Sequence, residues 1–282
     1  MKSLKQQTVV ILSVSSDIGF DLAKRYLQAG YRVVGTYRSQ CHVQSLKRFN
    51  ACKLFYCDLL DNESIKKFLA DYARLDWPWE IFISCVGHPQ PLTAFLKTDF
   101  LQWEQSVSIN AIKPLAVLHG LYPRRVKGKI CAVVFFAGGG TNNTVVDFSA
   151  YTLSKIMLIK MCEFLDAESQ DLNIFIVGPG WTKTKTHYKI LYDPSVSPEK
   201  SAQTREFLKT KKGTPLRDIY QCIEWLRSQG RRVAGGRNFS VVYDPWKASG
   251  RTDLAQALAA DPDMYKLRRH RNDFNNMTHA QK

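Results

Sequence analysis

The sequence of 282 residues lacks any long hydrophobic run. Its apolar stretches, such as residues 8–12 and 130–137, fall far short of the roughly 18 residues that a membrane-spanning helix needs. The basic start, Met1 to Lys5, is followed by neither a long apolar stretch nor a small-residue cleavage site. We therefore expect no signal peptide, no integral membrane segment and a cytoplasmic location.

Glycine, proline and cysteine also occur in numbers that exclude several classes of protein. With 16 glycines, 11 prolines and 45% hydrophobic residues, the chain is neither collagen-like nor disordered. The seven cysteines are odd in number and form no Cys-X-X-Cys motif. This pattern offers no metal site and favours a reducing compartment, where a buried thiol behaves as a small hydrophobic side chain.

Acidic residues are scarce relative to basic ones. The chain has 25 Asp and Glu against 40 Lys and Arg, which gives a formal net charge of +15. Such an excess indicates either general solubility or an anionic partner. That partner is a nucleic acid, a membrane surface, or a phosphorylated or carboxylated small molecule, and composition alone does not choose among them.

Short apolar segments alternate along the chain with longer helical segments. We expect strands at 8–12, 31–36, 54–57, 81–86, 130–137, 174–177 and 239–243. Helices are expected at 18–29, 63–72, 103–121, 150–169, 217–228 and 254–260. Near-continuous apolar strands between helices are typical of a parallel sheet that is covered on both faces. The prediction is an α/β fold, a Rossmann-like doubly wound sheet in three layers, with ligands beyond the carboxyl ends of its strands.

The expected strands and helices fall into one domain, residues 1–246, followed by a basic C-terminal extension, residues 247–282. The extension contains the basic cluster Lys266–Arg271. The segment from 183 to 217 is long and polar and does not fit the alternation of strands and helices.

The loop after the first expected strand occupies the place of a glycine-rich phosphate loop. It reads Leu12-Ser-Val-Ser-Ser-Asp-Ile-Gly19 and leads into a helix, whose N-terminus favours a pyrophosphate. Ser13 and Asp17 stand at the first two glycine positions, and only Gly19 remains. Serine hydroxyls donate to phosphate, whereas a carboxylate repels it, so we expect Asp17 to cap the helix with its side chain turned aside. A loop that binds no nucleotide is the alternative.

The end of the second expected strand lacks the acidic residue that accepts the ribose 2′-hydroxyl of NAD. The segment reads Gly35-Thr-Tyr-Arg-Ser39. Arg38 and Ser39 suit a 2′-phosphate, which predicts NADP(H) in preference to NAD(H). A solvated arginine at the end of a strand is the alternative.

A tyrosine and a lysine four residues apart occur twice, as Tyr151–Lys155 and Tyr243–Lys247. Pro245 breaks any helix through the second pair. The first pair lies in an expected helix, so its side chains project from one face, one turn apart. A lysine ammonium there is expected to lower the pKa of the phenol toward neutrality, which makes Tyr151 an acid–base group for a carbonyl or an alcohol.

From residue 7 to 244 the order and spacing of these features resemble the short-chain dehydrogenase/reductase family. Further matching segments are Cys57-Asp-Leu59, Ser84-Cys-Val-Gly87, Ser108-Ile-Asn110 and Pro179-Gly-Trp-Thr-Lys-Thr184. The resemblance implies that these residues hold the cofactor: Ser13, Ser15, Ser16, Ile18, Gly19, Arg38, Ser39, Asp58, Leu59, Gly87, Tyr151, Lys155, Pro179, Gly180, Thr182 and Thr184.

The resemblance also implies hydride transfer between the nicotinamide ring and a substrate carbonyl. In that reaction Tyr151 donates a proton to the developing alkoxide, and Lys155 holds the ribose hydroxyls and tunes Tyr151. Asn110 positions a water for the proton relay. The helices that carry Asn110 and Tyr151 pair between subunits in this family, which implies a homodimer or a homotetramer.

The sequence departs from the family at its catalytic serine, thirteen residues before the tyrosine, where this chain has Gly138. Loss of such a hydrogen-bond donor costs about 3–4 kcal/mol of transition-state stabilisation. Thr141, Ser149 or the backbone N–H groups of the glycine run are candidate substitutes, the last as an anion-binding nest. The alternative is a protein that binds NADP(H) without catalysis, as a sensor or a subunit partner.

The family places its substrate lid after the sixth strand, here at about residues 185–212. From 183 to 217 there are nine Lys and Arg against three Asp and Glu. This excess favours an anionic small molecule, such as a nucleotide-linked sugar, a sugar phosphate or a carrier-linked acyl group, with His187 and Tyr188 as recognition residues. A solvated loop is the alternative.

A weaker resemblance is to reductases of bacterial surface-polysaccharide synthesis, carried by residues 181–187, the triple glycine and Tyr265-Lys-Leu-Arg-Arg269. A third function, nucleic-acid or membrane-surface binding through the basic tail, lacks a recognisable module or a strongly amphipathic basic helix. We therefore expect no nucleic-acid partner.

Overall fold

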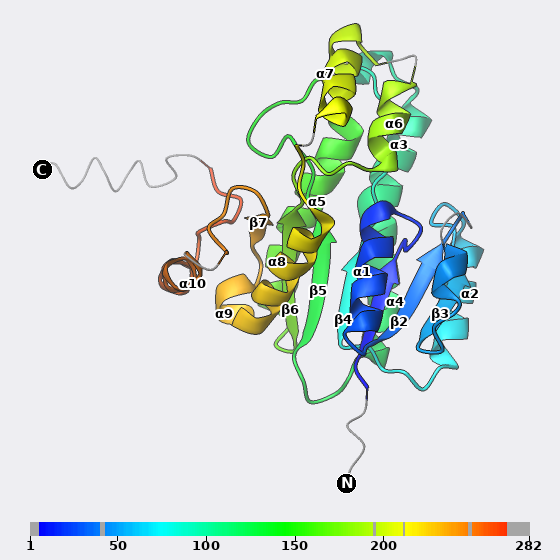
Figure 1. The fold of residues 1–282 in the computed structure, drawn as a ribbon, viewed down its shortest axis with the longest axis vertical. Helices are drawn as coiled ribbons and strands as arrows, with labels where there is room; N and C mark the ends of the chain where they lie inside the picture. The colour runs from blue at the N-terminus through cyan, green and yellow to red at the C-terminus, as the bar shows by residue number, and fades with distance from the viewer. Residues whose placement is uncertain (1–5, 40–42, 194–195, 211, 248–249, 270–282) are drawn as a thin grey trace, which may run out of the picture.

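Seven strands form one parallel sheet, in the order β3-β2-β1-β4-β5-β6-β7 (Figure 1). The computed structural model describes residues 6–39, 43–193, 196–210, 212–247 and 250–269. The strands are β1 (Thr8–Leu12), β2 (Arg32–Tyr37), β3 (Cys52–Tyr56), β4 (Ile81–Ser84), β5 (Cys131–Phe136), β6 (Leu172–Gly178) and β7 (Asn238–Ser240). The chain reverses its direction of travel across the sheet between β1 and β4, where a doubly wound sheet opens its ligand crevice. The predicted fold class is confirmed.

Helices cover both faces of the sheet. They are α1 (Asp17–Gln28), α2 (Asn62–Ala73), α3 (Phe100–Val107), α4 (Lys113–Leu121), α5 (Ser149–Glu168) and α8 (Leu216–Gln229). Short 3-10 turns lie at Val43–Leu46, Phe95–Lys97 and Tyr122–Arg124. A π-helical turn, Ser108–Ile112, interrupts the helix that was expected over 103–121 and separates α3 from α4. No helix within the described ranges is long and apolar enough to cross a membrane.

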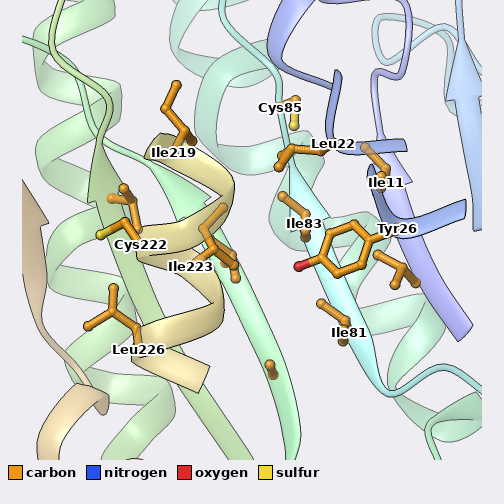
Figure 2. Packing of buried hydrophobic residues seen from close by; sticks show 14 of the residues in the cluster. Ile11, Leu22, Tyr26, Ile81, Ile83, Cys85, Ile219, Cys222, Ile223 and Leu226 are labelled. Carbon is orange, nitrogen blue, oxygen red and sulfur yellow. The ribbon is translucent and has the colours of Figure 1, made fainter. Parts of the chain in front are cut away.

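Two hydrophobic clusters lie on opposite faces of the sheet. One contains apolar residues of α1 and α8, and the other contains residues of α2, α4 and α5. Figure 2 shows how Ile219, Cys222, Ile223 and Leu226 project from one side of α8, at the spacing of a helix that buries a single face. Burial of this many side chains anchors the strands whose carboxyl ends form the site.

The long polar segment 183–217, which contains the expected substrate lid, is partly helical. The segment forms α6 (Lys185–Leu191) and α7 (Pro198–Lys209), which lie beyond the end of the sheet in Figure 1. A local signal for α7 was present, because Ser197 caps the helix by accepting from the Lys200 N–H, and Pro198 and Glu199 follow. Because this helix has few apolar residues, the spacing of apolar residues along the sequence did not indicate it.

The described part of the C-terminal extension packs against the same core as the rest of the chain. Helix α9 (Arg231–Ala234) precedes β7, and α10 (Arg251–Ala260) follows it. Leu254 and Leu258 of α10 are buried in the cluster that contains α1 and α8. Arg268 forms ion pairs with Glu163 and Asp263, so its charge is locally balanced. Part of the basic cluster, residues 270–271, lies outside the described residues.

Candidate active site

A cleft of about 490 Å³ opens at the carboxyl ends of the central strands and is bordered by α6. It brings together segments that lie far apart in the sequence, from the loop after β1 to the lid. The residues predicted to hold the cofactor line it, with the exception of Gly19: Ser13, Ser15, Ser16, Ile18, Arg38, Ser39, Asp58, Leu59, Gly87, Tyr151, Lys155, Pro179, Gly180, Thr182 and Thr184.

The loop after β1 has a backbone conformation that favours glycine at one of the two glycine positions where another residue stands. Ser13 adopts a φ of 69°, in the left-handed region that usually requires glycine. Gly19 lies beneath the loop, where an added Cβ would be 2.3 Å from the Ser13 carbonyl oxygen. Gly19 therefore does not line the cleft, because it packs closely beneath the loop and supports it.

Asp17 does not cap α1, which corrects the prediction from the sequence. Ser16 is the cap, because its hydroxyl accepts from the Gly19 N–H at 3.0 Å. The Asp17 side chain is turned aside, as expected, but toward the lid, where its carboxylate accepts from the Lys185 N–H at 2.6 Å. The partner lies 168 residues away in the chain, so no local pattern could reveal it.

Tyr151 and Lys155 lie one turn apart near the start of α5, and both line the cleft. The Lys155 ammonium donates to the Val86 carbonyl at 2.9 Å and lies 5.5 Å from the centre of the Tyr151 ring. Burial raises the pKa of Tyr151 to about 12 and lowers the pKa of Lys155 to about 8. The predicted lowering of the phenol pKa is therefore wrong in this arrangement, because desolvation disfavours both charged forms.

Gly138 leaves the space that the Tyr151 ring occupies. An added Cβ at residue 138 would lie 2.6 Å from Cε1 of Tyr151 and 3.1 Å from Cγ of Lys155. Any side chain at this position, including the serine typical of the family, must displace the phenol. The glycine and the placement of the tyrosine ring therefore depend on each other.

Replacing Gly138 with Ser is expected to lower turnover rather than restore a missing group. The new Cβ pushes the Tyr151 ring out of place, and overpacking of this kind costs about 1–3 kcal/mol of stability. Gly139→Ser is the matched control, since an added Cβ there meets nothing within 4 Å. Steady-state rates and melting temperatures of both variants check this. A Gly138→Ser enzyme that turns over faster than the wild type contradicts the inference that the Tyr151 ring needs a glycine at residue 138.

Asn110 is fully buried behind the cleft and does not line it. Its amide nitrogen donates to the His88 and Ser106 carbonyls at 2.8 and 2.9 Å, and its amide oxygen accepts from the His88 N–H at 2.8 Å. It sits in the π-helical turn, and this local unwinding aims its side chain at the loop after β4. Asn110 holds that loop in place; its role in a proton relay stays a prediction.

Thr141 and Ser149, the side chains predicted as substitutes for the missing serine, are not among the residues that line the cleft, and their role stays a prediction. The Ser149 hydroxyl accepts from the Trp103 indole N–H at 3.0 Å. Before Thr141 the chain turns at Gly140, which has a φ of 95°. The direction of this loop was not readable from the spacing of the residues.

Some residues of the cleft, such as His88 and Phe148, were not predicted from the sequence, whereas Lys185 and Lys189 are among the predicted lid cations. His88 and Phe148 line it, and so do Lys185 and Lys189 of α6. Burial and the charges of Lys189 and Arg38 lower the pKa of His88, which favours the neutral imidazole. His88 directly follows Gly87 in the loop after β4, and this position in the sequence could have identified it as a cleft residue.

The lid cations divide into two groups. Lys183 points away from the cleft and donates to the Leu208 and Thr210 carbonyls, where it closes the end of α7. Lys185 and Lys189 line the cleft, as does His187, whose ring also packs against Phe207. Tyr188, predicted as a recognition residue, does not line it.

Comparisons with known proteins agree with the fold. The family model for short chain dehydrogenase matches residues 7–193. A fatty acyl-CoA reductase of Acinetobacter baylyi is 26% identical over 219 residues, which cover 71% of this chain and 72% of that protein. The human dehydrogenase/reductase SDR family member 4 is 23% identical over 241 residues, 83% of this chain and 85% of that protein.

Solved structures show the same architecture. A short chain dehydrogenase/reductase from Saccharomyces cerevisiae has a TM-score of 0.77 at 18% identity and covers 93% of this chain and 100% of its own. A Shigella flexneri short chain dehydrogenase complexed with NADP has a TM-score of 0.68 at 19% identity, covering 83% and 96%. A 4-hydroxyisoleucine dehydrogenase complexed with NADH reaches 0.71 at 19% identity, also covering 83% and 96%. Together with its fold, the match over most of the chain shows that this protein belongs to the short-chain dehydrogenase/reductase family of oxidoreductases.

Proposed function

We propose that this protein is an NADP(H)-dependent oxidoreductase that reduces a carbonyl on an anionic small molecule. The observation that carries the proposal is the placement of Tyr151 and Lys155 in one cleft with the loop after β1. The cations Arg38, Lys185 and Lys189 line the same cleft, which supports an anionic ligand.

The residues present fit a nicotinamide dinucleotide. The Thr182 hydroxyl lines the cleft, is buried and has no hydrogen-bond partner among the described residues, so it offers a contact for a carboxamide. Ser13, Ser15 and Ile18 surround the first turn of α1, where free N–H groups favour a pyrophosphate. Asp17 opposes that charge, and Lys185 lies 3.9 Å from its carboxylate and offsets it.

When bound, the cofactor would supply a hydride to the substrate carbonyl. The Tyr151 hydroxyl then delivers the proton to the oxygen that becomes an alkoxide. Lys155 would hold the ribose hydroxyls, and its present bond to the Val86 carbonyl keeps it against the loop after β4. Asn110 supports the same loop through His88.

The raised pKa of Tyr151 is consistent with a role as proton donor in the reduction of a carbonyl. With a pKa of about 12, the phenol carries its proton at neutral pH and acts as a donor. Oxidation of an alcohol needs the tyrosinate as a base, and burial disfavours that form. The substrate classes we propose are a nucleotide-linked sugar, a sugar phosphate or a carrier-linked acyl group, and the weaker resemblance to polysaccharide pathways favours the first.

The preference for NADP(H) is expected to depend on Arg38. This side chain is exposed at the cleft and forms no ion pair with any described residue, so a 2′-phosphate finds it free. Arg38→Ala is expected to weaken NADPH binding about tenfold, the lower range for a charge-assisted hydrogen bond at an exposed site. NADH binding should change less than about threefold, because NADH has no 2′-phosphate for Arg38 to contact. Calorimetric titration of both cofactors measures this, and equal losses contradict the preference.

A protein that binds NADP(H) without catalysis remains the second candidate, because Gly138 replaces the catalytic serine and neither Thr141 nor Ser149 lines the cleft. NADPH consumption over a panel of nucleotide sugars, sugar phosphates and acyl thioesters separates the two functions. Binding of NADPH with no turnover of any substrate favours the second.

We also propose a homodimer or homotetramer in the cytoplasm. Leu153, Met157 and Phe164 of α5 are exposed at 50%, 40% and 53%, which supports a second copy on this helix. The described cysteines are all free and buried, which is consistent with a reducing compartment.

A further inference from the structure

The lid and the cofactor loop are joined by a carboxylate at a position where the family has glycine. Asp17 Oδ2 accepts from the backbone N–H of Lys185, the first residue of α6, at 2.6 Å. Helix α6 receives no cap from its own preceding residue, because the Thr184 side chain makes no capping bond. Asp17 therefore satisfies from a distant loop an N–H that the helix leaves open.

The Lys185 side chain makes a second link to the same loop. Its ammonium donates to the Ser15 carbonyl at 3.2 Å and lies 3.9 Å from Asp17 Oδ1. The side chains of Asp17 and Lys185 are 25% and 38% exposed, so water only partly screens the contact. Two groups of one lid residue, the N–H and the ammonium, thus contact two residues of the loop, Ser15 and Asp17.

Two other contacts of described residues join the lid to the body of the protein, and both are longer. Gln90 donates to Asp193 at 3.4 Å, near the end of α6. The Lys200 ammonium lies 4.8 Å from the centre of the Phe148 ring. The bond from Asp17 is the shorter and charge-assisted one, and it acts at the first residue of α6, the helix that follows β6 in the chain.

We infer that Asp17 is a positioning residue that fastens the lid helix α6 to the cofactor loop and so holds the lid over the cleft. The consequence for substrate binding rests on the proposed function, but the fastening itself does not. A glycine at residue 17 has no group that reaches Lys185, so the change from glycine is what creates the contact.

The test is hydrogen exchange of the α6 amides, residues 185–191, in the full chain with no ligand added. Asp17→Gly is expected to speed their exchange about tenfold, since loss of a partly exposed charge-assisted hydrogen bond costs about 1.4 kcal/mol. Asp17→Asn keeps an acceptor oxygen and is expected to stay within about threefold of the wild type. This rescue separates the bond from the mere presence of a side chain.

Lys185 provides a matched pair of variants. Lys185→Ala removes the ammonium and keeps the N–H, whereas Lys185→Pro removes both. Proline is tolerated at the first position of a helix, and Thr184 already has the extended φ and ψ, −136° and 164°, that precede proline well. We expect Lys185→Pro to speed exchange in residues 186–191 several-fold more than Lys185→Ala.

Three results overturn the inference. They are unchanged α6 exchange in Asp17→Gly, equal exchange in the two Lys185 variants, and an increase that extends to β5, which signals general loss of stability instead of lid release. A failure of the proposed function is a separate result, namely that no variant or wild-type protein oxidises NADPH with any carbonyl, and it leaves the exchange comparison intact.

Discussion

Tyr151→Phe is expected to reduce carbonyl turnover by about a hundredfold to ten-thousandfold and to leave NADPH affinity nearly unchanged. The phenylalanine ring fills the same space beside Gly138, where an added Cβ would be 2.6 Å from the tyrosine ring, so packing is retained. Only the hydroxyl that donates the proton is lost. Single-turnover measurements of NADPH oxidation, with NADPH binding followed by fluorescence, give both quantities.

The second tyrosine–lysine pair supplies the control for this experiment. Tyr243 is 88% exposed in the turn after β7, so Tyr243→Phe should leave turnover at the wild-type rate. Normal turnover in Tyr151→Phe would remove Tyr151 from the chemistry. Equal loss in both variants would point to a defect of preparation or folding.

Arg237→Met is expected to destabilise the protein by about 3–5 kcal/mol, which corresponds to a fall in melting temperature of about 10 °C. Arg237 is 3% exposed, and burial lowers the pKa of its guanidinium. The guanidinium donates to five backbone carbonyls, those of Arg232, Val233, Leu258, Asp261 and Met264. Methionine fills part of the volume but leaves these acceptors without a donor.

Arg232→Met is the control for that measurement, because Arg232 lies in the same short helix but is exposed. Its melting temperature should remain within about 2 °C of the wild type, as for most surface substitutions. A small effect in Arg237→Met would mean that the C-terminal segment is held by apolar burial of Leu254 and Leu258 alone.

Periodic apolar patterns made most of the fold predictable. Ile219, Cys222, Ile223 and Leu226 repeat at helical spacing in α8, and the apolar strand residues form unbroken runs. The lid helices were not predicted because few of their side chains are buried. Their stability comes from contacts within the lid and with the loop after β1. A pattern of residues along the chain carries no information about such partners.

The sequence predicted which residues form the candidate site better than it predicted what those residues do chemically. Family spacing located Tyr151 and Lys155, but the expected charge effect on the phenol ignored burial, which acts on both groups. Thr141 was chosen for its hydroxyl, although the direction of the loop that carries it depends on the turn at Gly140. Contacts between distant segments, such as Asp17 with Lys185, require the folded chain.

The mutual dependence of Gly138 and the Tyr151 ring constrains how this active site can evolve. A serine at 138 fits only if the start of α5 first moves the phenol aside, whereas that shift alone opens a void where the ring now lies. Each step by itself is harmful, and their effects are not additive. We therefore expect a serine at residue 138 to be accommodated only together with a second change that gives the phenol a new position.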